Sequence, residues 1–223
     1  MNKLNLPEGG NSIIYQKSRN YPKGLFDLSS PPEALYCIGD TKLLELDFLA
    51  IIGPRKATEY SLECTRRFAG YTGQCGYAVL SGGAQGTDEA AHLAAMASGC
   101  RTVAVVPNLS YRKEFYQKIV DNGGLLISPY KFEQEGIMSS MFHYRNRVIA
   151  AMSRAVLLCG AAMPSGTMST ALSAQSLGRR VLVVPGQIDD PAFAGSNRLI
   201  GNPAHVVCTE EQLQTQLICA DLS

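Results

Sequence analysis

Short apolar runs recur along the chain, each followed by glycine or proline and then by a stretch whose apolar residues return at helical spacing. Runs of this kind predict buried strands, and the stretches between them predict helices. The predicted strands cover residues 48–52, 77–80, 101–106, 124–127, 155–159 and 180–185. The predicted helices cover residues 58–74, 87–98, 112–121, 143–153 and 166–177. This alternation is typical of a parallel sheet.

Six strands joined by five helices predict an α/β protein with an open, doubly wound, mostly parallel sheet. A closed barrel would need about eight strand–helix units. Ligands of such sheets bind beyond the carboxyl ends of the strands, so we expect the loops there to carry function. The residues before 43 contain several prolines and no strand–helix unit. We therefore predict an N-terminal extension over residues 1–42, packed on a core domain over residues 43–223 that ends in a short helix.

Composition narrows the class of protein. A chain of 223 residues that is 46% hydrophobic and 17% charged suits one compact domain. Its net charge of +1 gives no global basic field, so a nucleic-acid site would have to be a local patch. Seven scattered cysteines without a C-x-x-C pair, and only three histidines, indicate neither a zinc site nor a disulfide framework. No apolar run is long enough for a membrane span, and we expect a cytoplasmic protein.

The segment SGGAQGTDEAAH, residues 81–92, places Gly82, Gly83 and Gly86 between a predicted strand and a predicted helix. Bare backbone amides at a helix start can approach a ligand closely, which makes this a candidate phosphate-binding turn. Asp88 and Glu89 in the first helical turn already complement the helix dipole and would repel a phosphate there. The spacing matches neither the dinucleotide nor the P-loop pattern. A tight turn with a purely structural role is the alternative.

A second candidate turn opens the helix predicted at 166–177. Ser165, Gly166 and Thr167 precede a segment without any acidic residue, so its amides and hydroxyls form an uncompensated cluster of donors. Such a cluster stabilises a phosphate by charge-assisted hydrogen bonds. The alternative is an ordinary hydroxyl-rich helix cap.

Basic residues and aromatic rings are interleaved in the loops. Between residues 143 and 201 there are six arginines and only two acids, which suggests a local anion-binding patch. Four basic residues follow predicted strands: Arg55, Lys56, Arg112 and Lys113. Cations that track a backbone, with aromatic faces that stack on bases, bind single strands without reading sequence. The interleaved aromatics are Tyr111, Tyr130, Phe132, Phe142 and Tyr144, of which we assign Phe132 and Tyr144 to the core.

Motifs of covalent catalysis are missing from the sequence. It contains neither G-x-S-x-G nor H-E-x-x-H, and no histidine accompanies a serine or cysteine in a nucleophile motif. We predict no catalytic residue, no metal site and no cofactor.

Several segments, taken in order, resemble the DNA-processing protein A family (DprA, also called Smf). They are the YP…PP..LY..GD element from Tyr21, then IIGPRKAT, SGGAQGTDEAAH, RTVAVVPNLSYRK, FHYRNRVIAAMSRAVLLCGAAMPSGTMSTA, SLGRRVLVVPGQ and GSNRLI. The resemblance implies a Rossmann-like domain that forms a homodimer, binds single-stranded DNA and helps to load the RecA recombinase in natural transformation. It implies a binding protein with no catalytic step.

By position, the resemblance implies phosphate contacts at Arg55 and Lys113, base stacking on Phe142, and a role for Arg145, which opens the R-N-R segment. The neighbouring cations Lys56 and Arg147 complete our predicted DNA-binding set. Four positions depart from the family pattern: Gln85 and Ser139 stand where basic residues are usual, and Pro129 and Gln175 stand where glutamates are usual.

A second resemblance, to the lysine-decarboxylase-like proteins of the same broad superfamily, keeps an alternative open. It implies a nucleotide-ligand sensor, or an enzyme that hydrolyses nucleotide N-glycosidic bonds, with both glycine turns around a phosphate and ribose. The segment PSGTMSTA lacks the second glycine and the acid of that enzyme group's P-G-G-x-G-T-x-x-E pattern.

Overall fold

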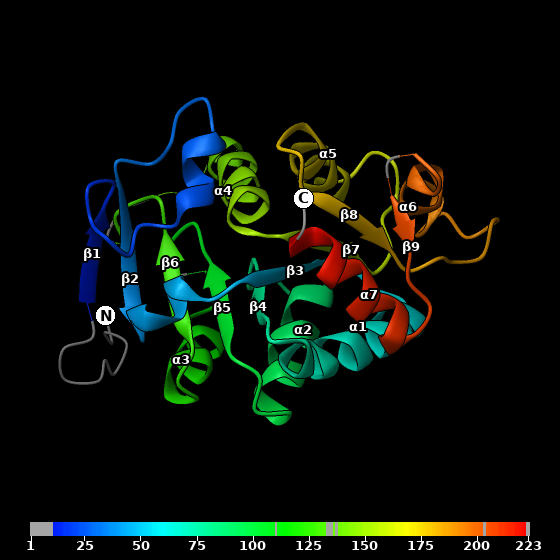
Figure 1. The fold of residues 1–223 in the computed structure, drawn as a ribbon, viewed down its shortest axis with the longest axis horizontal. Coiled ribbons are helices and arrows are strands. Elements are labelled where there is room, and N and C mark those ends of the chain that lie inside the picture. Colours follow the sequence, from blue (N-terminus) through cyan, green and yellow to red (C-terminus); the bar gives the residue numbers. More distant parts are fainter. Residues whose placement is uncertain (1–10, 110, 133–135, 137, 203, 222–223) are drawn as a thin grey trace.

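The computed structural model describes residues 11–109, 111–132, 136, 138–202 and 204–221. Nine strands among them form one sheet in the order β1-β2-β6-β5-β4-β3-β7-β8-β9 (Figure 1). Pairing is parallel from β6 through β9, whereas β1 and β2 add to the other edge in antiparallel fashion. The strands are β1 (Asn11–Tyr15), β2 (Ala34–Gly39), β3 (Phe48–Ile52), β4 (Ala78–Ser81), β5 (Thr102–Val105), β6 (Leu125–Ser128), β7 (Ala155–Leu158), β8 (Arg180–Val183) and β9 (His205–Val206).

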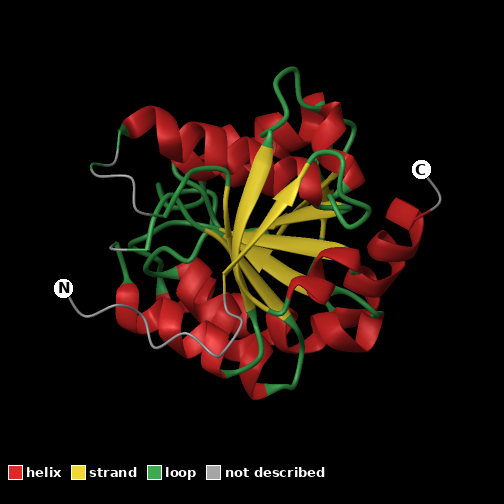
Figure 2. Ribbon diagram, turned by 90° about the vertical axis from the view of Figure 1, so that its left-hand side faces the viewer, coloured by secondary structure: helices red, strands yellow, loops and turns green. Residues whose placement is uncertain are grey.

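Helices cover both faces of the sheet (Figure 2), which confirms the predicted doubly wound α/β class. The α-helices are α1 (Glu59–Thr72), α2 (Thr87–Ala97), α3 (Lys113–Asp121), α4 (Ser139–Met152), α5 (Gly166–Ser176), α6 (Ala194–Leu199) and α7 (Glu210–Asp221). Three short 3-10 helices accompany them: η1 (Lys23–Asp27), η2 (Thr41–Glu45) and η3 (Gly73–Cys75). None of the helices in the described part of the chain is both long and apolar enough to cross a bilayer.

The central strand β3 divides the core, because successive side chains of a strand point to opposite faces. Phe48, Ala50 and Ile52 pack with residues of α4, α5 and the N-terminal segment. Leu49 and Ile51 pack with residues of α1, α2 and α7. Helix α3 covers the remaining part of the second face, over β2, β5 and β6. All five side chains of β3 are buried, which explains why its sequence, FLAII, is a continuous apolar run.

The six predicted strands and five predicted helices are all present, with ends displaced by a few residues at most. Helix α4 begins earlier than predicted, at Ser139. Strands β1, β2 and β9 and the short helix α6 were not predicted. Strand β2 pairs directly with β6, so part of the segment assigned to an N-terminal extension belongs to the sheet itself. The domain division at residue 42 stays a prediction.

Strand β2 should therefore be as important to stability as a core strand. Ile38 on β2 is fully buried, whereas Ile13 on the edge strand β1 is 45% exposed. We expect Ile38→Ala to lower the free energy of unfolding by about 2–5 kcal/mol, and the matched change Ile13→Ala by at most about 0.5 kcal/mol. Urea unfolding followed by circular dichroism measures both, and equal costs would contradict the placement of β2 in the core.

Candidate nucleic-acid interface

A hollow of about 330 Å³ lies where the strand order reverses, beyond the carboxyl ends of β3 and β7. This reversal point is the usual ligand-binding position of doubly wound sheets, because neighbouring loops diverge there. We name this hollow the switch-point pocket. Its lining comes from the loop after β3, the turn after β4, helix α4 and the start of α5: Ile52, Gly53, Pro54, Arg55, Ala84, Asp88, Phe142, His143, Arg145, Asn146, Ser165, Gly166, Thr167 and Thr170.

Each glycine of the turn after β4 lies so close to a neighbouring group that a side chain would collide with it. A Cβ on Gly82 would lie 2.1 Å from Nη1 of Arg145, and one on Gly83 would lie 2.9 Å from the ring of Tyr116. A Cβ on Gly86 would lie 2.5 Å from the carbonyl oxygens of Pro54 and Arg55. Gly83 and Gly86 also have positive φ angles, of 66° and 78°, which favour glycine. The bare backbone of this turn is therefore used for close packing within the protein.

Arg145 supports this turn from within the protein. The side chain is buried, and Nη2 donates a hydrogen bond of 2.8 Å to the carbonyl oxygen of Gly82. Its Nη1 donates to Oδ1 of Asn146 at 2.9 Å. On the other side of the turn, Asp88 is also buried and accepts a hydrogen bond of 3.3 Å from the amide of Ala84. The structure therefore places Arg145 as a buried support of the turn.

Burial and charge act in opposite directions on these two groups. Burial raises the pKa of Asp88, and the nearby positive charge of Arg145 opposes that rise only in part. Burial likewise lowers the pKa of Arg145, against the opposing charge of Asp88. Each group therefore reduces the cost of burying the other.

The start of α5 forms the opposite wall of the pocket. Oγ of Ser165 accepts a hydrogen bond of 3.2 Å from the amide of Met168, so Ser165 is the helix N-cap. Nδ2 of Asn146 donates to the carbonyl oxygen of Gly166 at 3.4 Å, which ties α4 to α5. The first turn of α5 contains no acidic residue, whereas that of α2 contains Asp88 and Glu89. An anion in this pocket is therefore favoured beside α5.

A cation and two aromatic rings form the mouth of the pocket. The guanidinium carbon of Arg55 lies 5.3 Å from the ring centre of Phe142 and 5.9 Å from that of Tyr111. The two rings meet edge to face, with centres 5.9 Å apart. Arg55 is exposed and has no ion pair among the described residues. Its charge is held by ring faces and stays available to a ligand.

The other predicted DNA contacts differ in position. Lys56 is exposed next to Arg55 but does not line the pocket. Lys113 is the first residue of α3 and lines a neighbouring hollow. Arg147 points away from the pocket, where Nη2 donates to Oγ of Ser29 at 3.0 Å. The structure thus brings together Arg55, Phe142, Arg145 and the two glycine turns.

Sequence reasoning overlooked two residues that shape the pocket, Gly53 and Asn146. A Cβ on Gly53 would lie 2.4 Å from Oγ1 of Thr87, so the loop after β3 can approach α2 only because residue 53 is glycine. Asn146 joins Arg145 to the start of α5. Its place inside R-N-R was the available signal. Phe132 and Tyr144, which we assigned to the core, are only half-buried and pack against the margins of two buried clusters.

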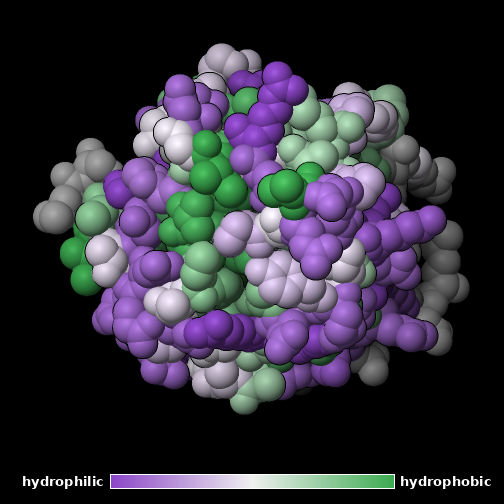
Figure 3. Space-filling model, turned by 90° about the vertical axis from the view of Figure 1, so that its right-hand side faces the viewer, coloured by the Kyte–Doolittle hydropathy of each residue, from purple (hydrophilic) through white to green (hydrophobic). Residues whose placement is uncertain are grey.

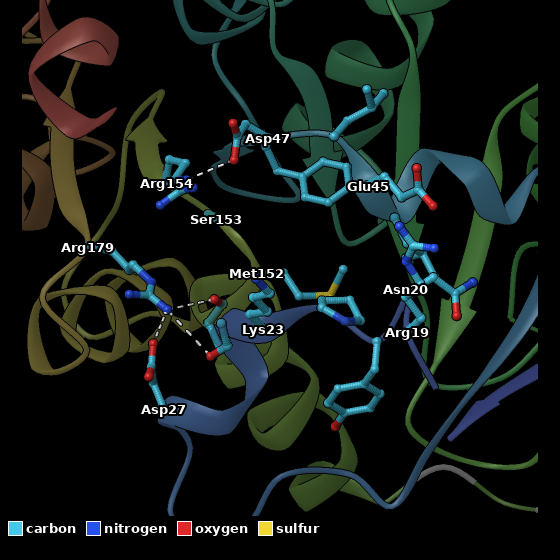
Figure 4. A pocket seen from close by; sticks show the side chains of 17 residues that line it. Arg19, Asn20, Lys23, Asp27, Glu45, Asp47, Met152, Ser153, Arg154 and Arg179 are labelled. Carbon is cyan, nitrogen blue, oxygen red and sulfur yellow. Dashed lines mark hydrogen bonds and ion pairs between the residues drawn. The ribbon is translucent and has the colours of Figure 1, made fainter. Parts of the chain in front are cut away.

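A second hollow, of about 510 Å³, opens at the amino ends of β3 and β7, at the opposite edge of the sheet. Figure 4 shows that two of its three arginines, Arg154 and Arg179, are engaged within the protein. Nε of Arg154 donates to Asp47 at 2.8 Å. Nη2 of Arg179 donates to Asp27 at 2.5 Å and to the carbonyl oxygen of Ala151 at 3.0 Å. These contacts tie the N-terminal segment to the sheet domain.

The six arginines between residues 143 and 201 therefore do not form one patch. Arg154 and Arg179 are paired at the amino edge, and Arg180 donates to Gln216 at 2.7 Å. Only Arg145 lines the switch-point pocket. The prediction that these arginines form one local anion-binding patch is therefore wrong. Arg154, Arg179 and Arg180 directly precede or begin a strand and so lie at the amino ends of the strands, whereas the pocket lies at the carboxyl ends.

Comparison with known proteins now identifies the family. The family model of DNA recombination-mediator protein A matches residues 12–218. The chain belongs to this family. Protein Smf of Synechocystis sp. is 32% identical over 208 residues, which are 89% of this chain and 52% of that protein. DNA processing protein DprA of Streptococcus pneumoniae is 30% identical over 204 residues, which are 86% of this chain and 70% of that protein.

The family resemblance seen in the sequence is thus confirmed, while the chain spans about half the length of the Synechocystis relative. Among solved structures, DprA of Streptococcus pneumoniae superposes with a TM-score of 0.85 at 27% identity, over 92% of this chain and 74% of that one. DNA processing protein A of Helicobacter pylori, known for its single-stranded DNA binding mode, gives 0.81 at 31% identity, over 94% and 96%. The molybdenum cofactor carrier protein of Chlamydomonas reinhardtii gives 0.58 at 18% identity, over 80% and 99%, a likeness of fold alone.

Gly82 can be tested as a close-contact position. We expect Gly82→Ala to lower the free energy of unfolding by about 1–3 kcal/mol, because the added carbon overlaps the buried guanidinium of Arg145. Gly70 in α1 is a matched control, since its added Cβ would meet nothing within 4 Å. Gly70→Ala should stabilise the helix by up to about 1 kcal/mol. Urea unfolding of both variants decides, and a neutral Gly82→Ala would contradict the tight contact.

His92, buried beneath the same turn, predicts a pH dependence. Burial, together with the charges of Arg145 and Arg112, lowers the pKa of His92 from 6.5 to about 3. The unfolded chain takes up this proton below about pH 6.5, whereas the folded protein does not. Stability that is complete above pH 6.5 should therefore be lost as the pH falls toward 3, by up to about 1.4 kcal/mol per unit.

Urea unfolding across this pH range, with His92→Gln as the reference variant, isolates the effect. Asp88 contributes with the opposite sign, since its raised pKa gives stability that is lost as the pH rises, but it is present in both proteins. The wild type should lose more stability than His92→Gln on acidification. Parallel pH profiles would show that His92 is protonated in the folded state.

Proposed function

We propose that this chain binds single-stranded DNA in the switch-point pocket and acts as a DNA-processing protein without a covalent step of its own. The observation that carries the proposal is Arg55, an exposed cation with no carboxylate partner among the described residues, whose guanidinium lies over the rings of Tyr111 and Phe142 at the pocket mouth. Phosphate and base are the two chemical groups that such a pair of surfaces binds together. The DNA-binding relative from Helicobacter pylori supports the same reading.

Each side chain has a distinct part in this proposal. Arg55, Lys56 and Lys113 neutralise phosphates, and one base stacks on Phe142. A phosphate inside the pocket is bound by the amides and hydroxyls at Ser165, Gly166 and Thr167, where no acid opposes it. Arg145 is a positioning residue, since it is buried against Gly82 and adds its charge from below. Arg147 is outside this set because it contacts Ser29.

The recombination role belongs to the same proposal. We propose a partner recombinase of the RecA type and action in the cytoplasm during DNA uptake; the family's description as recombination mediators supports the recombinase partner. A homodimer is supported by the edge of the sheet at β9, where Ile200 and Val206 are 39% and 36% exposed. Figure 3 shows hydrophobic side chains among polar ones on the side of the molecule that carries α6 and β9.

Fluorescence anisotropy of a labelled oligothymidine, titrated with the protein at several salt concentrations, tests the binding function. Engagement of three phosphates by Arg55, Lys56 and Lys113 predicts a slope of log affinity against log salt of about −2 for a single strand. Arg55→Ala should weaken binding and make the slope shallower by about 0.7. Phe142→Ala should cost about 1–3 kcal/mol with the slope unchanged, because stacking releases no counterions.

Arg66 provides a matched control for charge. It is exposed on α1 and pairs with Glu59, so Arg66→Ala should leave DNA affinity unchanged. A duplex of the same length serves as the second control and should bind more weakly. Failure to bind the single strand at low salt, with binding of a free nucleotide instead, would contradict the DNA function and favour a nucleotide sensor.

A further inference from the structure

A third hollow, of about 550 Å³, lies next to the switch-point pocket, between α2 and α3. We name it the α2–α3 groove. Its apolar lining includes Leu93 and Phe115, and its rim includes Tyr111, Lys113 and Lys118. A lining that combines an exposed aromatic ring, Tyr111, with lysines suits a nucleic-acid strand, whose bases are flat and whose phosphates are charged.

The ring of Tyr111 lies between the groove and the pocket. Tyr111 lines the groove, while its ring contacts both the guanidinium of Arg55 and the edge of Phe142 at the pocket mouth. The side chain is 38% exposed, so one part of it remains open to a ligand. A strand that leaves the pocket beside Phe142 therefore meets Tyr111 next.

Some charged side chains of the groove are paired within the protein, and others have no ion pair among the described residues. Arg112 forms an ion pair of 2.9 Å with Glu89, donates to the carbonyl oxygen of Ala84 at 3.0 Å and lies 4.5 Å above the ring of Phe115. It therefore fixes α3 to the glycine turn and neutralises Glu89. Lys113 and Lys118 have no ion pair among the described residues, and Glu114 is the remaining acid. Two lysines against one acid leave these unpaired groups with a net charge of +1.

We propose that a bound single strand continues from the switch-point pocket into the α2–α3 groove. A second base stacks on Tyr111, and Lys118 binds a phosphate further along the strand than the one at Lys113. This inference rests on the proposed DNA function and adds a second segment to its binding site. It assigns a ligand role to Tyr111, whose ring lies at the mouth of the pocket, and to Lys118, neither of which is among the residues that line the pocket.

Oligothymidines of two lengths test this path by fluorescence anisotropy, one of about four nucleotides and one of about sixteen, the range of single-strand site sizes. The short strand fills the pocket alone, whereas the long one also enters the groove. Lys118→Gln should weaken binding of the long strand about threefold to tenfold, with a salt slope shallower by about 0.7, and leave the short strand unaffected. Tyr111→Ala should weaken the long strand by about fivefold to 150-fold, and more than the short one.

Matched controls use Lys42→Gln and Tyr15→Ala, exposed residues on η2 and β1 outside both hollows, which should leave both affinities unchanged. Lys118→Gln that changes neither affinity, or both equally, would overturn the path through the groove. In that case Arg55→Ala still reports on the pocket, because it weakens both lengths. Failure of the unmodified protein to bind either strand would instead remove the DNA function itself.

Discussion

The contact between Arg145 and the backbone of Gly82 organises the whole functional edge of this protein. A guanidinium buried under a turn needs acceptors there: Nη2 finds the carbonyl oxygen of Gly82 and Nη1 the side chain of Asn146, while Nε has no hydrogen-bond partner among the described residues. Asp88 is the nearby opposing charge. Through these groups one side chain of α4 links the end of β4, the first turn of α2 and the start of α5. The turn, the pocket wall and the helix are fixed together.

Different charged residues hold the site in place and contact the proposed ligand. The buried Arg145 and Asp88 reduce each other's cost of burial by their opposite charges, whereas the exposed cation, Arg55, is held by ring faces instead of a carboxylate. A ring orients a guanidinium without neutralising it. The mouth of the pocket thus keeps a full positive charge even though the net charge of the chain is only +1.

The sequence predicted the sheet well because most of its strands are buried on both faces and are read as continuous apolar runs, as in FLAII and AVLL. Strand β2 was missed because its ALYCIG follows two prolines, and β9 because it has only two residues. At the site, loops that follow the strands β3, β4 and β7 line one pocket, as expected for a doubly wound sheet. Arg145 and Arg147 face different ways because residues two positions apart in a helix lie about 200° apart around its axis. Arg145 therefore faces the glycine turn, whereas Arg147 faces Ser29.

Helix α5 carries no charged side chain anywhere along its length. Its attraction for an anion therefore comes from main-chain amides, which no change of pH in the physiological range can titrate and which every residue except proline supplies. Many side chains of α5 could therefore change while the amino end of the helix kept its attraction for an anion. It is sensitive to two changes in its first turn: a proline, which would remove an amide donor, and an acid, which would place a fixed negative charge against the ligand.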